Sequence, residues 1–144
     1  MKALDTNVLV RFLVKDDAEQ AQQVYSLFKQ AEIHQQRLFV PLLVVLETIW
    51  VLQAVYGIDD QDILTVLNDL LLMPILLFES QPVLHAFIGP ATGNNYDLAD
   101  LLIAHSASGL HCESVLTFDK KAAKFDGFEL IGYPHKPGQN LPGF

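Results

Sequence analysis

Short apolar runs alternate with longer segments of helical periodicity along most of this chain. Val24, Phe28 and Ala31 recur at the spacing of one helix face, whereas residues 38–40 form a short run that is apolar throughout, as in a buried strand. The pattern predicts strands at about residues 2–5, 38–40, 75–78, 114–117 and 128–131. It predicts helices at about residues 6–14, 17–31, 41–56, 59–72, 80–87, 97–109 and 120–125, and a loop at 89–95. This alternation predicts an α/β fold around a mainly parallel sheet.

The length of 144 residues is that of one compact domain. We expect it to span residues 1–131, with residues 132–144 as an extended tail of the same domain, because that segment is rich in proline and glycine. The apolar share of 51% and the mean hydropathy of +0.27 are high, so either the core is large or a partner covers apolar surface. Homodimerisation is the simplest such arrangement.

From the sequence we expect neither a membrane span nor a signal peptide. No window approaches the roughly 18 uninterrupted apolar residues of a span, and Asp5 and Arg11 interrupt the N-terminal apolar stretch. A single cysteine, Cys112, excludes an intrachain disulfide and a thiolate metal cluster, as expected for a reducing compartment. These features together predict a cytoplasmic protein.

The net charge of -8 argues against a simple nucleic-acid-binding protein, which normally carries a basic surface. It does not argue against a metal-dependent nuclease, because bound cations change the sign of the local field where a phosphate docks. An acidic surface also suits a basic protein partner.

Two aspartates follow predicted strands directly. Asp5 comes after the first strand and Asp119 follows the strand at 114–117. Ligands of parallel sheets bind beyond the carboxyl ends of the strands, so these two carboxylates converge if the strands are neighbours. Each also has a structural explanation, since Asp5 can cap the following helix and Asp119 can belong to an ordinary turn.

Two predicted helices contain further acids in apolar surroundings. The neighbours of Glu47 on its helix face are apolar, so we expect it to avoid solvent, either in an acidic site or in an ion pair with Arg11, Arg37 or a lysine. Asp97 and Asp100 share one side of the first turn of another helix. Capping explains Asp97 well and Asp100 less well.

Like charges at about 4 Å repel by roughly 4 kcal/mol at an effective dielectric near 20, so a pocket of such carboxylates needs a cation. All-oxygen ligands favour Mg²⁺ or Mn²⁺ over Zn²⁺. Such a site suits phosphodiester cleavage, in which one ion activates the attacking water and a second stabilises the departing 3′ oxygen.

The acidic segments together resemble the PIN-domain ribonucleases, and among them the VapC-type toxins of bacterial and archaeal toxin–antitoxin pairs. The matching pieces, in order over residues 1 to about 131, are Leu4-Asp5-Thr6-Asn7-Val8-Leu9, Glu47 in the helix after Val40-Pro41, Tyr96-Asp97-Leu98-Ala99-Asp100-Leu101-Leu102-Ile103-Ala104, and Leu116-Thr117-Phe118-Asp119-Lys120-Lys121.

The resemblance implies a three-layer α/β/α domain with Mg²⁺- or Mn²⁺-dependent endoribonuclease activity, commonly in a dimer. It implies an acidic quartet with one accessory acid and three supporting polar residues. The quartet is Asp5, Glu47, Asp100 and Asp119, the accessory acid is Asp97, and the supporting residues are Thr6, Asn7 and Thr117. It also implies an antitoxin that folds over the toxin and covers apolar surface. Asp119 departs from the many members that have asparagine there, but it still supplies an oxygen ligand.

Lys120, Lys121 and Lys124 lie beside Asp119 and could steer an RNA backbone to the metal, although a solvated helix face explains them equally well. A different functional class is a receiver-like signalling domain or another non-catalytic, acidic metal-binding domain. The receiver pattern fits poorly, because the mid-chain strand ends in Phe78-Glu79. A haloacid-dehalogenase-like phosphatase expects an aspartate at position 7, where this chain has Asn7.

Overall fold

The computed structural model describes residues 1–132, so the tail expected at 132–144 lies almost entirely outside the described residues. Its elements, in chain order, are β1 (Lys2–Ala3), α1 (Thr6–Val14), α2 (Ala18–Ile33), β2 (Leu38–Val40), α3 (Leu42–Ala54), α4 (Asp60–Leu71), β3 (Leu76–Phe78), α5 (Gln81–Ala91), α6 (Leu98–Gly109), β4 (Val115–Thr117), the 3-10 helix η1 (Ala122–Lys124) and β5 (Phe128–Leu130). The α/β class is confirmed, and every strand pair in the described chain is parallel.

The five strands form two separate sheets. One has the order β1-β2-β3, with Lys2 opposite Leu38 and Leu38 opposite Leu76. The other consists of β4 and β5, with Val115 opposite Phe128. Within residues 1–132, β4 is not a neighbour of β1, so the strands that precede Asp5 and Asp119 do not meet within one chain.

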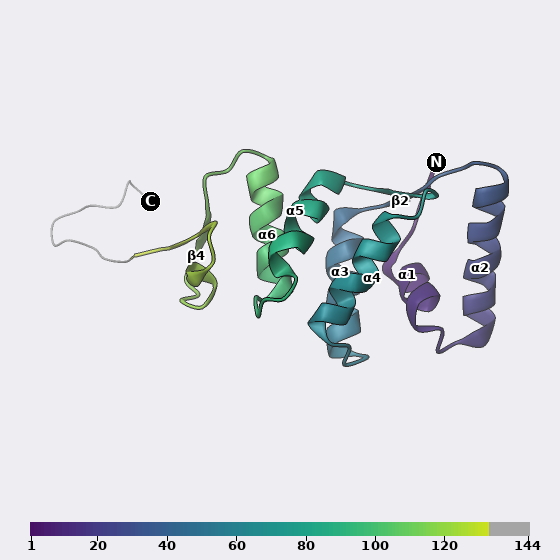
Figure 1. Cartoon of the computed structure of the whole chain (residues 1–144), viewed down its shortest axis with the longest axis horizontal. Helices are drawn as coiled ribbons and strands as arrows, with labels where there is room; N and C mark the ends of the chain where they lie inside the picture. Colours follow the sequence, from purple (N-terminus) through teal and green to yellow (C-terminus); the bar gives the residue numbers. More distant parts are fainter. Residues whose placement is uncertain (133–144) are drawn as a thin grey trace.

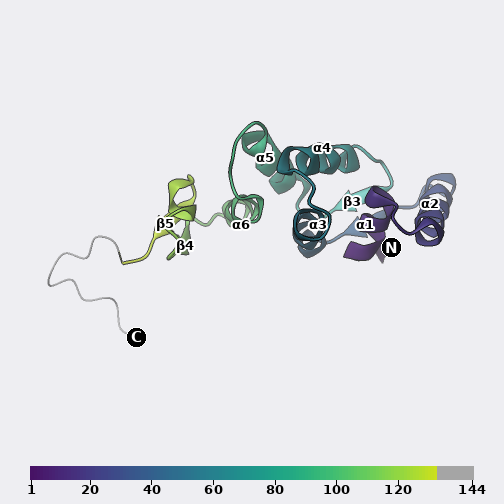
Figure 2. The same ribbon diagram turned by 90° about the horizontal axis from the view of Figure 1, so that it is seen from below.

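Helices separate the two sheets along the long axis of the molecule. Figures 1 and 2 both place α2 at one end, then the three-stranded sheet with α1, then α3 and α4, then α5 and α6, and finally β4 and β5 at the other end. The hydrophobic core lies between the three-stranded sheet and the helices around it, where Leu9, Val40, Ile49, Ile63 and Phe87 are fully or almost fully buried.

Local sequence signals account for most element boundaries. Asp17 accepts a hydrogen bond from the backbone N–H of Gln20 and caps α2. Pro41 precedes α3, and Gly57 adopts a positive φ of 61° in the turn after it. The loop predicted at 89–95 is wrong in part, because α5 continues through Pro90 to Ala91. Proline lacks the N–H that would bond to the carbonyl four residues earlier, so α5 includes Pro90 in its last turn at the cost of one backbone hydrogen bond.

No helix among residues 1–132 is both long enough and apolar enough to cross a membrane.

Candidate functional site

Asp5 stands between β1 and α1 and is exposed to solvent. Its Oδ1 accepts a hydrogen bond of 3.2 Å from the backbone N–H of Val8, so Asp5 is the N-cap of α1. The capping role considered from the sequence is therefore real. Oδ2 has no hydrogen-bond partner within the described residues and can bind a ligand as well.

The two polar neighbours predicted to support Asp5 lie at the start of α1. Thr6 is buried, whereas Asn7 is exposed and lines an open cavity of about 380 Å³ beside Asp5. Their predicted roles at an acidic site stay predictions.

Glu47 is exposed on α3, so the expectation that it avoids solvent is wrong. The helix is apolar nearly all round, and its inward face is Val45, Ile49 and Leu52, which leaves Glu47 on the opposite side with Leu43 and Trp50. The predicted ion-pair alternative is also wrong within residues 1–132, because no basic side chain there forms a salt bridge with Glu47. The outward position keeps this carboxylate free to bind a ligand.

Asp97 and Asp100 lie at the start of α6, as the sequence predicts. Oδ1 of Asp97 accepts a hydrogen bond of 2.9 Å from the backbone N–H of Asp100, which makes Asp97 the N-cap. Partial burial raises the pKa of the Asp100 carboxyl above its usual value, and the negative charges of Asp97 and Asp119 raise it further, while Lys121 lowers it. A nearby cation would therefore stabilise the ionised form of Asp100.

Asp119 follows β4 and is exposed. Its Oδ1 accepts backbone hydrogen bonds from Lys121 at 2.8 Å and from Ala122 at 3.3 Å, which orders the turn into η1. The hydroxyl of Thr117 accepts a hydrogen bond of 3.0 Å from the backbone N–H of Asp119. Thr117 thus fixes the position of this acid through the main chain, and Oδ2 of Asp119 has no partner in the described part of the chain.

The candidate acids fall into two groups. The charges that act on Asp100 come from Asp97, Asp119 and Lys121, which places one group around the start of α6. Asp5 precedes α1, far along the molecule from β4 in both ribbon views (Figures 1 and 2). Within residues 1–132, no three His, Cys, Asp or Glu side chains lie close enough together to hold a metal ion. The donors fit Mg²⁺ or Mn²⁺ in chemistry, since all are carboxylate oxygens, but one chain does not bring them together.

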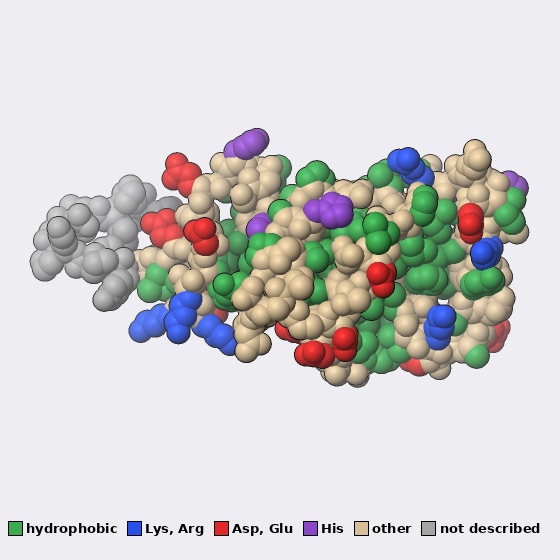
Figure 3. All heavy atoms as spheres, in the orientation of Figure 1, with side chains coloured by type: hydrophobic (Ala, Val, Ile, Leu, Met, Phe, Trp, Pro, Cys, Tyr) green, Lys and Arg blue, Asp and Glu red, His purple; other side chains and the backbone are tan. Residues whose placement is uncertain are grey.

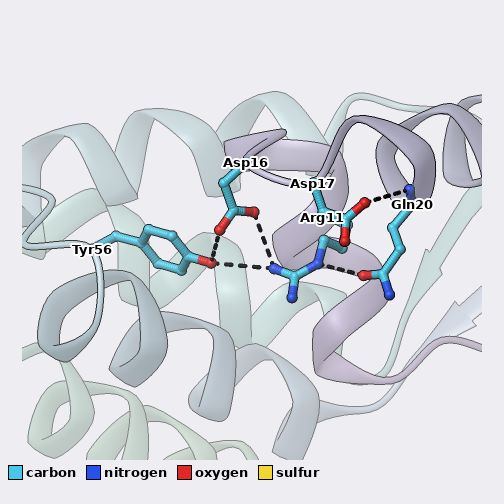
Figure 4. Close-up of polar contacts among 5 residues, drawn as sticks. All are labelled: Arg11, Asp16, Asp17, Gln20 and Tyr56. Atoms are coloured by element: carbon cyan, nitrogen blue, oxygen red, sulfur yellow. Dashed lines mark hydrogen bonds and ion pairs between the residues drawn. The ribbon is translucent and has the colours of Figure 1, made fainter.

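Sequence reasoning missed a cluster of polar contacts around Arg11 (Figure 4). Arg11 also lines the cavity beside Asp5. Nε of Arg11 donates to Oε1 of Gln20 at 2.6 Å, and Nη1 donates to Oδ1 of Asp16 at 3.1 Å and to the hydroxyl of Tyr56 at 3.2 Å. The signal was available, because Arg11 lies four residues after Asn7 and shares its helix face. This cation is ordered close to the N-terminal acids and can contact a phosphate.

Lys120, Lys121 and Lys124 are all exposed around η1. Figure 3 shows basic side chains gathered at the end of the molecule that carries β4 and β5, with acidic side chains beside them. The structure is therefore compatible with either a steering role or a solvated surface.

Comparison with known proteins identifies relatives that cover almost the whole chain. The family model described as PIN domain matches residues 2–127. A curated VapC ribonuclease of Aquifex aeolicus (strain VF5) is 26% identical over 131 residues, which cover 91% of this chain and 96% of the relative.

Proposed function

The chain belongs to the PIN-domain family, and from this premise we propose that it is a divalent-metal-dependent endoribonuclease that hydrolyses RNA phosphodiester bonds. The observation that carries the proposal is the position of Asp100 at the start of α6, where the charges of Asp97 and Asp119 both act on it, inside the segment that the family model matches. Because the negative charges of Asp97 and Asp119 raise the pKa of the Asp100 carboxyl, a bound cation would stabilise its ionised form.

The metal is proposed to be Mg²⁺ or Mn²⁺, held by Asp5, Glu47, Asp100 and Asp119 with Asp97 as an accessory ligand. When bound, such an ion supplies charge neutralisation at the phosphate and activation of a water molecule. Three of these aspartates are already oriented before any ligand binds, because Oδ1 of each accepts a hydrogen bond from a backbone N–H. They are Asp5, Asp97 and Asp119.

Other residues of the chain bind and position the substrate. Lys120, Lys121 and Lys124 lie beside Asp119 and attract the RNA backbone through its phosphates. Arg11 is held in place by Asp16 and Tyr56 and offers a second phosphate contact near Asp5. Thr117 holds the backbone of Asp119, while Thr6 and Asn7 support the loop that follows β1.

The relation to a VapC ribonuclease extends the proposal to a biological role. The protein acts as the toxin of a toxin–antitoxin pair in the cytoplasm, as a homodimer, and a cognate antitoxin neutralises it. The nuclease domain spans residues 1–131, with residues 132–144 as its tail. An antitoxin that supplies basic and apolar side chains would complement the acidic charge and the exposed apolar surface of this chain.

The test is cleavage of end-labelled single-stranded RNA with Mg²⁺ or Mn²⁺, with and without EDTA. We expect metal-dependent cutting that Asp100→Asn and Asp119→Asn each reduce more than ~100-fold, because loss of an outer-shell partner alone costs 10- to 100-fold. Asp69→Asn on the exposed side of α4 is the matched control and should cut like the wild type.

Equal cutting by all variants would refute the proposed site. Metal binding without cleavage by the wild-type chain would instead favour the non-catalytic alternative.

A further inference from the structure

Each of the two sheets ends in an open strand edge. Among the strands of residues 1–132, β1 pairs only with β2, and β4 pairs only with β5. Leu4 donates its backbone N–H to Phe39, so the N–H and C=O of the preceding Ala3 point to the other, open side of β1. Val115 and Thr117 face β5, so the backbone groups of Leu116 point to the open side of β4. Unpaired strand edges of this kind are templates for further pairing.

The side chains around these edges are also uncovered. On β4 and just after it, Leu116 is 63% exposed and Phe118 is 79% exposed. On α3, Leu43 is 77% exposed and Trp50 is 61% exposed. A strand of a parallel sheet normally packs apolar side chains on both faces, so β4 lacks a covering layer.

An apolar groove of about 420 Å³ runs between α3 and α6. Its main apolar lining residues are Leu42, Leu43, Leu46, Leu102, Ile103 and Leu110. Two of them, Leu43 and Leu110, are more than three-quarters exposed. The groove is thus an exposed apolar surface against which the uncovered apolar side chains of β4 can pack.

The missing neighbour of β1 is not β4 of the same chain, because α6 lies between them (Figures 1 and 2). One side of α6 packs against α3 and α5. On its other side Phe125 stacks edge-on against Tyr96, with ring centroids 4.6 Å apart, and Gly127 packs against Ala104. His111, with a φ of 66°, lies in the tight turn that follows α6 and donates its backbone N–H to Ser108.

We propose that two copies of this chain exchange their C-terminal strands, so that β4 of each copy pairs with β1 of the other. A five-stranded parallel sheet of order β3-β2-β1-β4-β5 then forms twice, once on each side of a two-fold axis. A second copy is the occupant that the geometry favours, because every chain carries both halves of the pairing and a two-fold dimer pairs the open edges of β1 and β4 in both copies. A different partner would cover only one of them.

The exchange completes the acidic site, and in this respect the inference rests on the proposed function. Each site takes Asp5 and Glu47 from one copy and Asp97, Asp100 and Asp119 from the other. Strand pairing of β1 with β4 brings the residues that follow the two strands, Asp5 and Asp119, to the same sheet edge. The exposed lysines around η1 then lie beside acids of the other copy, which adds charge complementarity.

Disulfide cross-linking tests the exchange independently of catalysis. Lys2→Cys is combined with Leu116→Cys, or with Ser114→Cys for the alternative register, in a Cys112→Ser background, since Cys112 is free and exposed. Neighbouring strands bring paired residues within the 4.4–6.8 Å between Cα atoms that a disulfide requires. We expect a covalent dimer on a non-reducing gel. A cross-linked monomer would show same-chain pairing and overturn the proposal, and so would the absence of any cross-link.

Complementation tests the shared site. Co-expressed Asp5→Asn and Asp100→Asn chains regain one intact site per mixed dimer, so random pairing predicts ~25% of wild-type cleavage. Mixing Asp100→Asn with Asp119→Asn is the matched control and should restore nothing, because both residues come from the same copy. No recovery in the first mixture would refute sharing. An inactive wild type would refute the proposed function alone, and the cross-link would still decide the exchange.

Discussion

Asp5 has two separable roles, and a comparison with Asp17 distinguishes them. Both residues are helix N-caps whose Oδ1 accepts a backbone hydrogen bond, at 3.2 Å from Val8 and at 2.9 Å from Gln20. Only Asp5 is a candidate metal ligand. The perturbation is the pair of single variants Asp5→Asn and Asp17→Asn, in which the cap hydrogen bond is retained and only the charge is lost.

The structure sets the size of the expected effects. Asparagine caps helices about as well as aspartate, so each variant loses mainly the interaction of its charge with the helix dipole, about 0.3–1 kcal/mol. For a chain of this length, that loss lowers Tm by about 1–4 °C. Cleavage should respond differently, with a loss above ~100-fold for Asp5→Asn and none for Asp17→Asn.

Thermal unfolding followed by circular dichroism and initial rates of RNA cleavage measure the two effects on the same protein samples. The alanine variants at both positions extend the series, because loss of the cap costs about 0.5–2 kcal/mol in either case. If Asp5→Asn and Asp17→Asn cut RNA equally well, Asp5 is only a cap and the reasoning about the site is refuted.

Three further outcomes follow from the structure. Asp100→Asn should raise Tm at neutral pH, because the raised pKa of Asp100 means that its ionised form destabilises the fold. The gain in Tm should shrink as pH falls through that pKa and vanish below the unfolded-state value near 3.8, and a gain that stays constant with pH would contradict this cause. Added Mg²⁺ should raise the Tm of the wild type but have less effect on Asp100→Asn, as measured by calorimetry. Gly109→Ala should cost about 1–3 kcal/mol, since the new Cβ would lie 2.6 Å from Cγ2 of Val83; urea unfolding measures the loss, and the double variant with Val83→Ala should recover most of it.

Local sequence signals predicted most of the elements. α1 and β2 have the predicted bounds, because a capping aspartate or a bounded apolar run marks them. The direction of every strand pair also followed from the alternation of strands with helices. These features depend on residues a few positions apart, which a sequence pattern contains.

Features that depend on distant segments were less predictable. Glu47 was placed among apolar neighbours correctly, but a helix that is apolar nearly all round does not define which face is inward, so its exposure was missed. Convergence of Asp5 with Asp119 required β1 and β4 to be neighbours, and the order of strands in a sheet is set by packing between whole segments. The sequence identified the chemistry of the acids better than their arrangement in space.

The unpaired edge of β1 has a consequence for handling the protein at high concentration. A molecule can accept β4 from one neighbour and donate its own β4 to a different neighbour. The series of contacts then does not close, and the assembly grows into an open filament. Closed pairs are favoured in dilute solution, because the second contact of a pair forms within one assembly and does not need a third molecule. Concentrated preparations should therefore contain ladders of higher assemblies that dilution converts to the closed form.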